Sequence, residues 1–168
     1  MRPIYRCDIA RAAAASCQLP PKCPAPEVVP APGPIGLIRH LLDLGQLREL
    51  IQVGRIGTPI IDVTWDGGPT FAKKVATVAE AFAKPVAFHD CSGPVTLAVS
   101  THLAMACPNV VEQEITRGFY YGWYHGCVDQ LPPLENGFIR PPEGHGLGLS
   151  LAADILTRPD AILRTTEA

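Results

Sequence analysis

Three short apolar runs decide the fold of this chain, and each ends in an ionisable residue: Thr58-Pro-Ile-Ile-Asp62, Lys84-Pro-Val-Ala-Phe-His89 and Asn109-Val-Val-Glu-Gln-Glu114. Two segments with the apolar spacing of helices, 69–83 and 94–106, lie between them. The ionisable ends are 27 (89 − 62) and 25 (114 − 89) residues apart, near the ~30 residues of a strand–helix–strand unit. The pattern predicts an α/β fold with parallel strands over 58–63, 85–88 and 110–113.

The ionisable residues that end these runs are candidates for chemistry. Neighbouring parallel strands lie ~4.8 Å apart, so equivalent strand ends meet at one edge of the sheet, where barrels and open α/β sheets place their active sites. An imidazole held by a carboxylate is a common general base, and we therefore predict that Asp62 and His89 act together. A turn or helix cap is the alternative for Asp62, and an ion pair with Arg117 is the alternative for Glu114.

The residues after His89 have simpler expected roles. Asp90 is interpreted as a turn or capping acid, and Ser92 as a cap of the helix in which Pro94 stands near the first turn. Cys91 is a less favoured nucleophile, because no second histidine is placed to activate it.

Helical patterns surround the three predicted strands. The pattern is helical from Ile35, and Gly54 marks the expected end of that first helix. Each of the next two helices has one predicted buried stripe. The stripes are Phe71, Val75, Val78, Ala79 and Phe82 in one helix, and Val95, Val99, Leu103 and Ala106 in the other.

Length, net charge and cysteine content limit the class of protein further. The 168 residues suit one ordinary domain. The formal net charge of −2 argues against a nucleic-acid partner, and no apolar run approaches the ~20 residues of a membrane span. The six cysteines form no C-x-x-C pair and no signal peptide is recognisable, so we expect reduced thiols and a cytoplasmic protein. Residues 1–34 hold 8 of the 18 prolines and are predicted to form a disordered tail.

Several motifs occur in an order that resembles a known family. They are Ile61-Asp-Val-Thr-Trp-Asp-Gly-Gly68, Pro85-Val-Ala-Phe-His-Asp-Cys-Ser-Gly-Pro94, Gln113-Glu114, Arg117-Gly-Phe-Tyr-Tyr-Gly-Trp-Tyr124 and the stretch from Gly137 to Gly148. Over roughly 47–161 the sequence resembles the mandelate racemase/muconate-lactonizing branch of the enolase superfamily. The nearest likeness is to its sugar-acid dehydratases, of the mannonate, gluconate or galactonate type.

This resemblance implies part of a (β/α) TIM-type barrel. Residues 35–130 would form its last three to four strand–helix units. Residues 131–168 would be a short extension that packs on the capping domain in full-length relatives, and the tail 1–34 would be non-homologous.

The resemblance also implies roles for individual residues. Asp62 and His89 would move the proton beside a substrate carboxylate or protonate a departing hydroxyl, and Glu114 would hydrogen-bond that carboxylate. Family Mg²⁺ ligands lie on earlier strands, so we expect no metal ligands in this chain. The implied substrate-binding residues are Trp65, Asp90 and Trp123.

Four functional readings remain open from the sequence. We expect a truncated sugar-acid dehydratase that is inactive alone, because the metal-binding strands are missing. A racemase or cycloisomerase of the same superfamily, a half-barrel that needs a complementing chain or self-associates, and a non-catalytic binding module that uses the aromatic cluster 119–124 are the alternatives.

Overall fold

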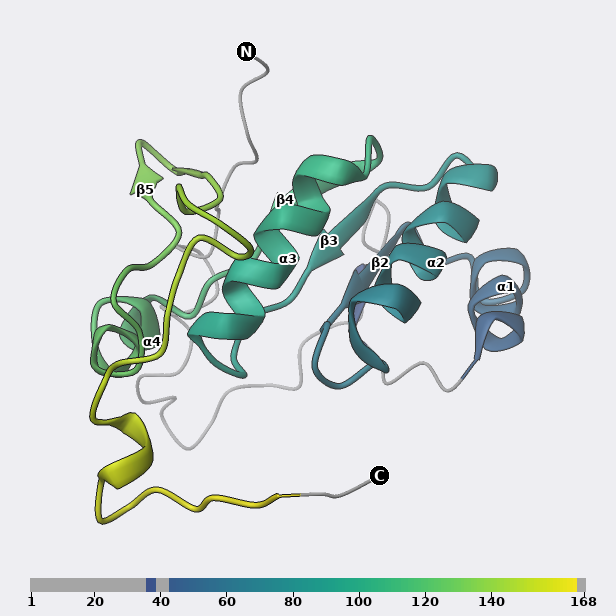
Figure 1. The fold of residues 1–168 in the computed structure, drawn as a ribbon. Helices are drawn as coiled ribbons and strands as arrows, with labels where there is room; N and C mark the ends of the chain where they lie inside the picture. The colour runs from purple at the N-terminus through teal and green to yellow at the C-terminus, as the bar shows by residue number, and fades with distance from the viewer. Residues whose placement is uncertain (1–35, 39–42, 166–168) are drawn as a thin grey trace, which may run out of the picture.

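The structure, a computed structural model, describes residues 36–38 and 43–165 (Figure 1). The predicted tail 1–34 lies outside these residues. One parallel sheet has the order β1-β2-β3-β4, and its strands are β1 (Gly36–Ile38), β2 (Thr58–Ile61), β3 (Val86–Phe88) and β4 (Val110–Gln113). The predicted α/β fold with parallel strands is confirmed.

Three helices connect these strands: α1 (Leu44–Gln52), α2 (Gly68–Ala81) and α3 (Pro94–Ala106). Figure 1 shows them on the same side of the sheet, and α2 contacts both α1 and α3. Their inner faces and the strands bury the first core, which includes Leu47, Val75 and Phe88. Strands covered by helices in this way are what part of a (β/α) barrel requires.

The prediction of a helix from Ile35 is wrong at its start. Gly36–Ile38 is a strand, paired in parallel with β2 from Gly36 opposite Thr58, and the helix begins only at Leu44. There the Asp43 side chain accepts a hydrogen bond from the Gln46 amide at 2.9 Å, as an N-cap does. A three-residue strand shows no period of its own, because its pairing with a distant segment is what defines it.

The predicted buried stripe of α3 is right only in its middle. Val99 and Leu103 pack on the first core, but Val95 and Ala106 are exposed, whereas Leu97, Thr101 and Ala104 are buried. This helix contributes Ala104 to the first core and Leu97 to a second core, so more than one of its faces is covered. Thr101 can be buried because its hydroxyl donates to the Leu97 carbonyl at 2.7 Å. The stripe predicted for α2 holds, with Val75 and Ala79 fully buried.

The chain after β4 builds that second core from short, irregular elements. These elements are α4 (Arg117–Tyr120), the 3-10 helices η2 (Trp123–Gly126) and η3 (Ile155–Thr157), and the antiparallel pair β5 (Leu134–Glu135) and β6 (Phe138–Ile139). Asn136 and Gly137 join that pair with φ of 53° and 79°, the positive values that a tight two-residue hairpin turn requires. Within the described residues, no helix has the length and apolar character needed to cross a membrane.

Candidate active site

The register of the sheet places three ionisable residues in one row. Ile61 lies opposite Phe88, and Phe88 lies opposite Gln113. The next residue on each strand is therefore Asp62, His89 or Glu114. The backbone pairing continues to this level, since the His89 amide donates to the Ile61 carbonyl and the Glu114 amide to the Phe88 carbonyl, both at 2.8 Å. Residues at one level of neighbouring parallel strands point to the same face.

An irregularity in β4 is needed to complete this row. Val86 lies opposite Val110, but Ala87 lies opposite Glu112, so Val111 is an extra residue. A regular register would set Gln113 beside His89 and turn Glu114 to the other face. The bulge therefore selects which of two neighbouring side chains joins the site.

Asp62 and His89 form a hydrogen-bonded pair. His89 Nδ1 lies 3.0 Å from Asp62 Oδ2, and Asp62 is only 1% exposed. An ionised carboxylate only accepts, so Nδ1 carries the hydrogen and Nε2 is left to exchange protons. The arrangement is that of a general base whose tautomer is fixed by a carboxylate.

The Asp62 carboxylate is itself held by its own loop. The amides of Thr64 and Trp65 donate to Oδ1 at 2.7 and 3.1 Å. The Ser92 hydroxyl donates to Oδ2 at 3.0 Å. The prediction that Ser92 caps α3 is wrong, because the N-cap is Gly93 and no side chain caps that helix. A cap would accept a bond from a backbone amide, whereas the Ser92 hydroxyl donates, and a bond donated to an ionised carboxylate is a strong one.

Glu114 is the third member of the row. Burial raises the pKa of its carboxyl, the nearby His89 charge acts in the opposite direction, and Glu112 raises the pKa further. Arg117 places its guanidinium 5.3 Å from the centre of the Tyr121 ring. Among the ion pairs of the described residues, none joins Arg117 to Glu114. A raised pKa makes this carboxyl easier to protonate when an anionic ligand lies beside it.

The two tryptophans predicted to contact substrate lie in different surroundings. The Trp65 ring is 5.0 Å from the His89 ring and 43% exposed, so it stands beside the acid–imidazole pair. Trp123 packs on Phe119 and Tyr124 and is 49% exposed. Substrate contact by either residue stays a prediction.

Asp90 follows His89 but is turned into the second core. It is 1% exposed, and the Tyr124 hydroxyl donates to its Oδ1 at 2.9 Å. Its Oδ2 has no hydrogen-bond partner among the described residues. Burial raises the pKa of Asp90 to about 6, although the Tyr124 bond acts in the opposite direction. Substrate binding by Asp90 stays a prediction; what the structure shows is a link between the strand end and the aromatic segment.

Two supporting residues were not predicted from the sequence. Ser92 stands three residues after His89, so a polar group in that loop was a usable signal. Tyr124 is 34 residues from Asp90, and nothing in the local pattern indicates their contact.

Magnesium, the metal that the resemblance implies, does not suit the cluster of donors at the ends of β2 and β3. The one group of three potential ligands found in the described part of the chain is Asp62, His89 and Cys91. Mg²⁺ prefers oxygen ligands in an octahedron, whereas this group offers one carboxylate, one imidazole and one thiol. We therefore derive no step of the chemistry through magnesium at these residues.

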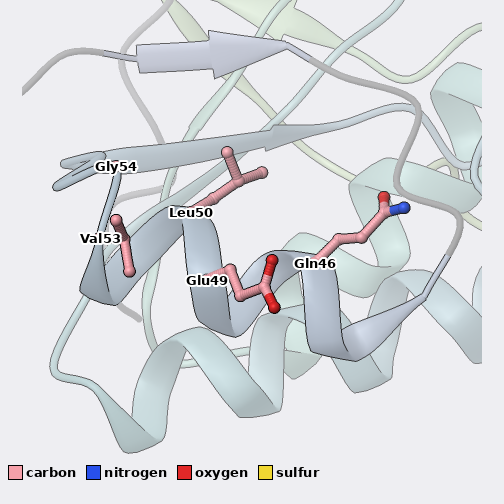
Figure 2. Close-up of a pocket in the computed structure, with 5 residues that line it drawn as sticks. All are labelled: Gln46, Glu49, Leu50, Val53 and Gly54. Carbon is pink, nitrogen blue, oxygen red and sulfur yellow. The ribbon is translucent and has the colours of Figure 1, made fainter.

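A hollow beside α1 is not part of this site. It has a volume of about 520 Å³ and is lined by Gln46, Glu49, Leu50, Val53 and Gly54 of α1 and its end (Figure 2). The end of α1 leads into the start of β2, so it lies at the opposite edge of the sheet from Asp62.

Parallel strands, helices on one side and an acid–imidazole pair at the strand ends define a portion of an enzyme barrel. The chain belongs to the enolase C-terminal domain-like family, whose model matches residues 28–155. The resemblance to the mandelate racemase branch and its sugar-acid dehydratases is thereby confirmed.

Individual relatives agree with this assignment. D-xylonate dehydratase of Haloferax volcanii is 31% identical over 107 residues, which are 64% of this chain and 26% of that protein. D-galactonate dehydratase of Ralstonia nicotianae is 28% identical over 123 residues, covering 70% of this chain and 32% of that protein. The structure of an enolase of the mandelate racemase subgroup from Agrobacterium tumefaciens is 42% identical, with a TM-score of 0.67, and the match covers 74% of this chain and 34% of that one. The chain spans about a quarter to a third of the length of these relatives.

Proposed function

We propose that this chain carries the acid–base part of a sugar-acid dehydratase. The observation that carries the proposal is the 3.0 Å bond between Asp62 and His89 at the ends of adjacent parallel strands. The relatives named D-xylonate and D-galactonate dehydratase support the substrate class.

In this proposal His89 moves the proton. Dehydration of a sugar acid removes a hydrogen from the carbon beside the carboxylate and expels the hydroxyl of the next carbon as water. The free Nε2 of His89 either takes that hydrogen or protonates the departing hydroxyl. Asp62 holds the imidazole and stabilises its charged form. Positioned acid–base help of this kind contributes ~10²–10⁴-fold to a rate.

Glu114 binds the reacting carboxylate in the same proposal. Burial raises the pKa of its carboxyl, so it takes up a proton more readily beside an anion, and the protonated form donates a hydrogen bond to the substrate carboxylate. That bond strengthens as the substrate carboxylate gains charge when its neighbouring carbon loses a proton.

We further propose that the magnesium ligands lie outside the described residues, and that the described part of the chain is inactive without them. The donor cluster of Asp62, His89 and Cys91 supports this, because it offers a single carboxylate beside an imidazole and a thiol. Calorimetric titration of the purified chain with Mg²⁺ tests it. We expect Asp62→Asn and Glu114→Gln to leave any Mg²⁺ binding unchanged, and 1:1 binding that either variant abolishes would overturn the proposal.

The acid–base roles are tested with the full chain co-expressed with the amino-terminal half of a D-galactonate dehydratase. The assay follows D-xylonate, D-galactonate and D-gluconate by proton NMR in D₂O, so that exchange of the hydrogen beside the carboxylate and loss of water are both seen. We expect Asp62→Asn and His89→Asn to lower turnover by ~10²-fold or more while substrate affinity changes little. His102→Asn is the matched control, since its Nε2 lies 3.1 Å from the Leu147 carbonyl oxygen.

The results of this assay distinguish the dehydratase from the alternative functions. Exchange or inversion at that carbon without loss of water would assign a racemase. Turnover that survives His89→Asn would overturn the acid–base proposal altogether.

A further inference from the structure

Three different metal-binding donors converge where β2 and β3 end. The donor atoms of Asp62, His89 and Cys91 all lie within 4.8 Å of one another, and the first two are 3.0 Å apart. Cys91 is a free, partly buried thiol. The dehydratase chemistry proposed above makes no use of it.

The spacing of these atoms is close to that of a tetrahedral metal site. Bonds of ~2.0–2.1 Å to nitrogen and oxygen and ~2.3 Å to sulfur set the donors of such a site ~3.3–3.8 Å apart. Asp62 Oδ2 and His89 Nδ1 already approach this closely, and rotation of the Cys91 side chain by about 1 Å at sulfur completes the triangle. Three protein ligands leave the fourth position for water.

The charge around the thiol also favours a cation. The Asp62 side chain is 1% exposed, so solvent screens its charge little. A bound divalent ion also deprotonates a coordinating thiol outright. One carboxylate and one thiolate together balance the two positive charges of the metal.

We propose that Asp62, His89 and Cys91 form a site for a thiolate-preferring divalent ion of the zinc class. The imidazole and thiol exclude Mg²⁺ and Ca²⁺ as the preferred ions and suit Zn²⁺ or Co²⁺. The inference rests on the donor geometry alone and does not require the proposed dehydratase function.

Binding at this site releases one proton. The Cys91 thiol loses its hydrogen to solvent when sulfur binds the ion. Neutral His89 keeps one hydrogen, which moves from Nδ1 to Nε2, because Nδ1 now binds the ion in place of the hydrogen shared with Asp62.

The first test titrates the full chain with Co²⁺ as a spectroscopic probe and with Zn²⁺ by calorimetry. We expect a 1:1 complex with a thiolate-to-cobalt charge-transfer band. Cys91→Ser and His89→Asn should each remove or shift the band and weaken Zn²⁺ binding by at least about tenfold, since even outer-shell changes cost 10–100-fold. Cys127→Ser, the loss of another partly buried free thiol, should leave band and affinity unchanged.

A second test needs no variant and so does not depend on refolding. Wild-type chain is alkylated with iodoacetamide with and without Zn²⁺, and peptide mass spectrometry follows each cysteine. We expect Zn²⁺ to slow alkylation of Cys91 at least about tenfold and that of Cys127 not at all. Equal protection of both thiols, absence of a cobalt band, or a band that persists unchanged in Cys91→Ser would overturn the proposed site.

Discussion

The sheet edge and the segment that follows it are held by different means. At the edge, Asp62, His89 and Glu114 stand level because backbone bonds continue the strand register. After residue 115 side chains also bridge the chain at long range, as the Tyr120 hydroxyl does when it donates to the Pro132 carbonyl at 2.8 Å. Where strands pair regularly, the positions of residues can be predicted from their spacing in the sequence. Where side chains anchor the chain, the positions are known only from the folded structure.

The bond between Asp90 and Tyr124 is one of the contacts that join the two regions. Asp90 belongs to the loop after β3, and Tyr124 belongs to η2. Four substitutions, ordered by expected effect, test how far each region depends on its own kind of support.

The largest effect is expected at the sheet. Phe88 is fully buried in β3, so Phe88→Ala should lower the free energy of unfolding by about 3–5 kcal/mol, from lost burial and the cavity left behind. Urea unfolding followed by circular dichroism measures this. Val95→Ala, at an exposed position of α3, is the control and should change it by less than about 0.5 kcal/mol. A small loss for Phe88→Ala would mean that the sheet is not the chief support.

The next effect is a change in pH dependence. The folded-state pKa of Asp90 is raised from 3.8 to about 6, so between these pH values the folded chain binds more protons than the unfolded chain. Stability should therefore fall as pH rises from about 4 to about 6, by up to about 3 kcal/mol from this group.

Asp90→Asn removes that titration. Its unfolding free energy, measured in urea at pH 4, 5, 6 and 7, should fall less steeply than that of the wild type. Parallel profiles for the two proteins would show that this carboxyl does not link stability to pH.

A smaller loss is expected from the partner of Asp90. Tyr124→Phe keeps the ring but removes the hydroxyl that donates to the buried Asp90 carboxyl. The expected cost is about 1–3 kcal/mol in urea unfolding. Tyr121→Phe, at a 58% exposed ring, serves as the control and should cost far less. If the two variants match, the link between the regions contributes nothing measurable.

The smallest effect is expected at the β5–β6 hairpin. Arg140 and Glu135 form an ion pair of 3.0 Å, but both side chains are largely exposed. Glu135→Gln should therefore lower the unfolding free energy by less than about 1 kcal/mol. Thermal unfolding at low and high salt measures the loss, with Glu143→Gln as the control. A loss above 2 kcal/mol would place this pair among the main supports of the segment.

Most of the fold could be predicted because most of its helices and strands show a regular spacing of apolar residues in their own sequence. The strands ending at Ile61, Phe88 and Gln113, and the helices that begin near Pro69 and Pro94, all follow from local spacing. The strand Gly36–Ile38 was missed because only its pairing with β2 defines it. Part of the buried face of α3 was missed because two cores cover that helix.

Some features of the candidate site could likewise be predicted from the sequence, and others could not. The meeting of Asp62 and His89 follows from spacing along parallel strands. The β4 bulge at Val111 brings Glu114 level with His89. The sequence does not reveal this bulge, because Val111 looks like any other apolar residue of a strand. Contacts such as Tyr124 with Asp90 depend on how a long irregular segment folds back, and local pattern carries no information on that.

The tilt of Trp65 over His89 has an optical consequence. An indole 5.0 Å from an imidazole loses emission when the imidazole becomes cationic, so the protein carries a built-in fluorophore that senses the charge of one ring. The sequence has two tryptophans, and Trp123→Phe would leave Trp65 as the sole emitter. Its brightness as a function of acidity, or of added zinc, would then follow the proton on His89 directly, without substrate or turnover.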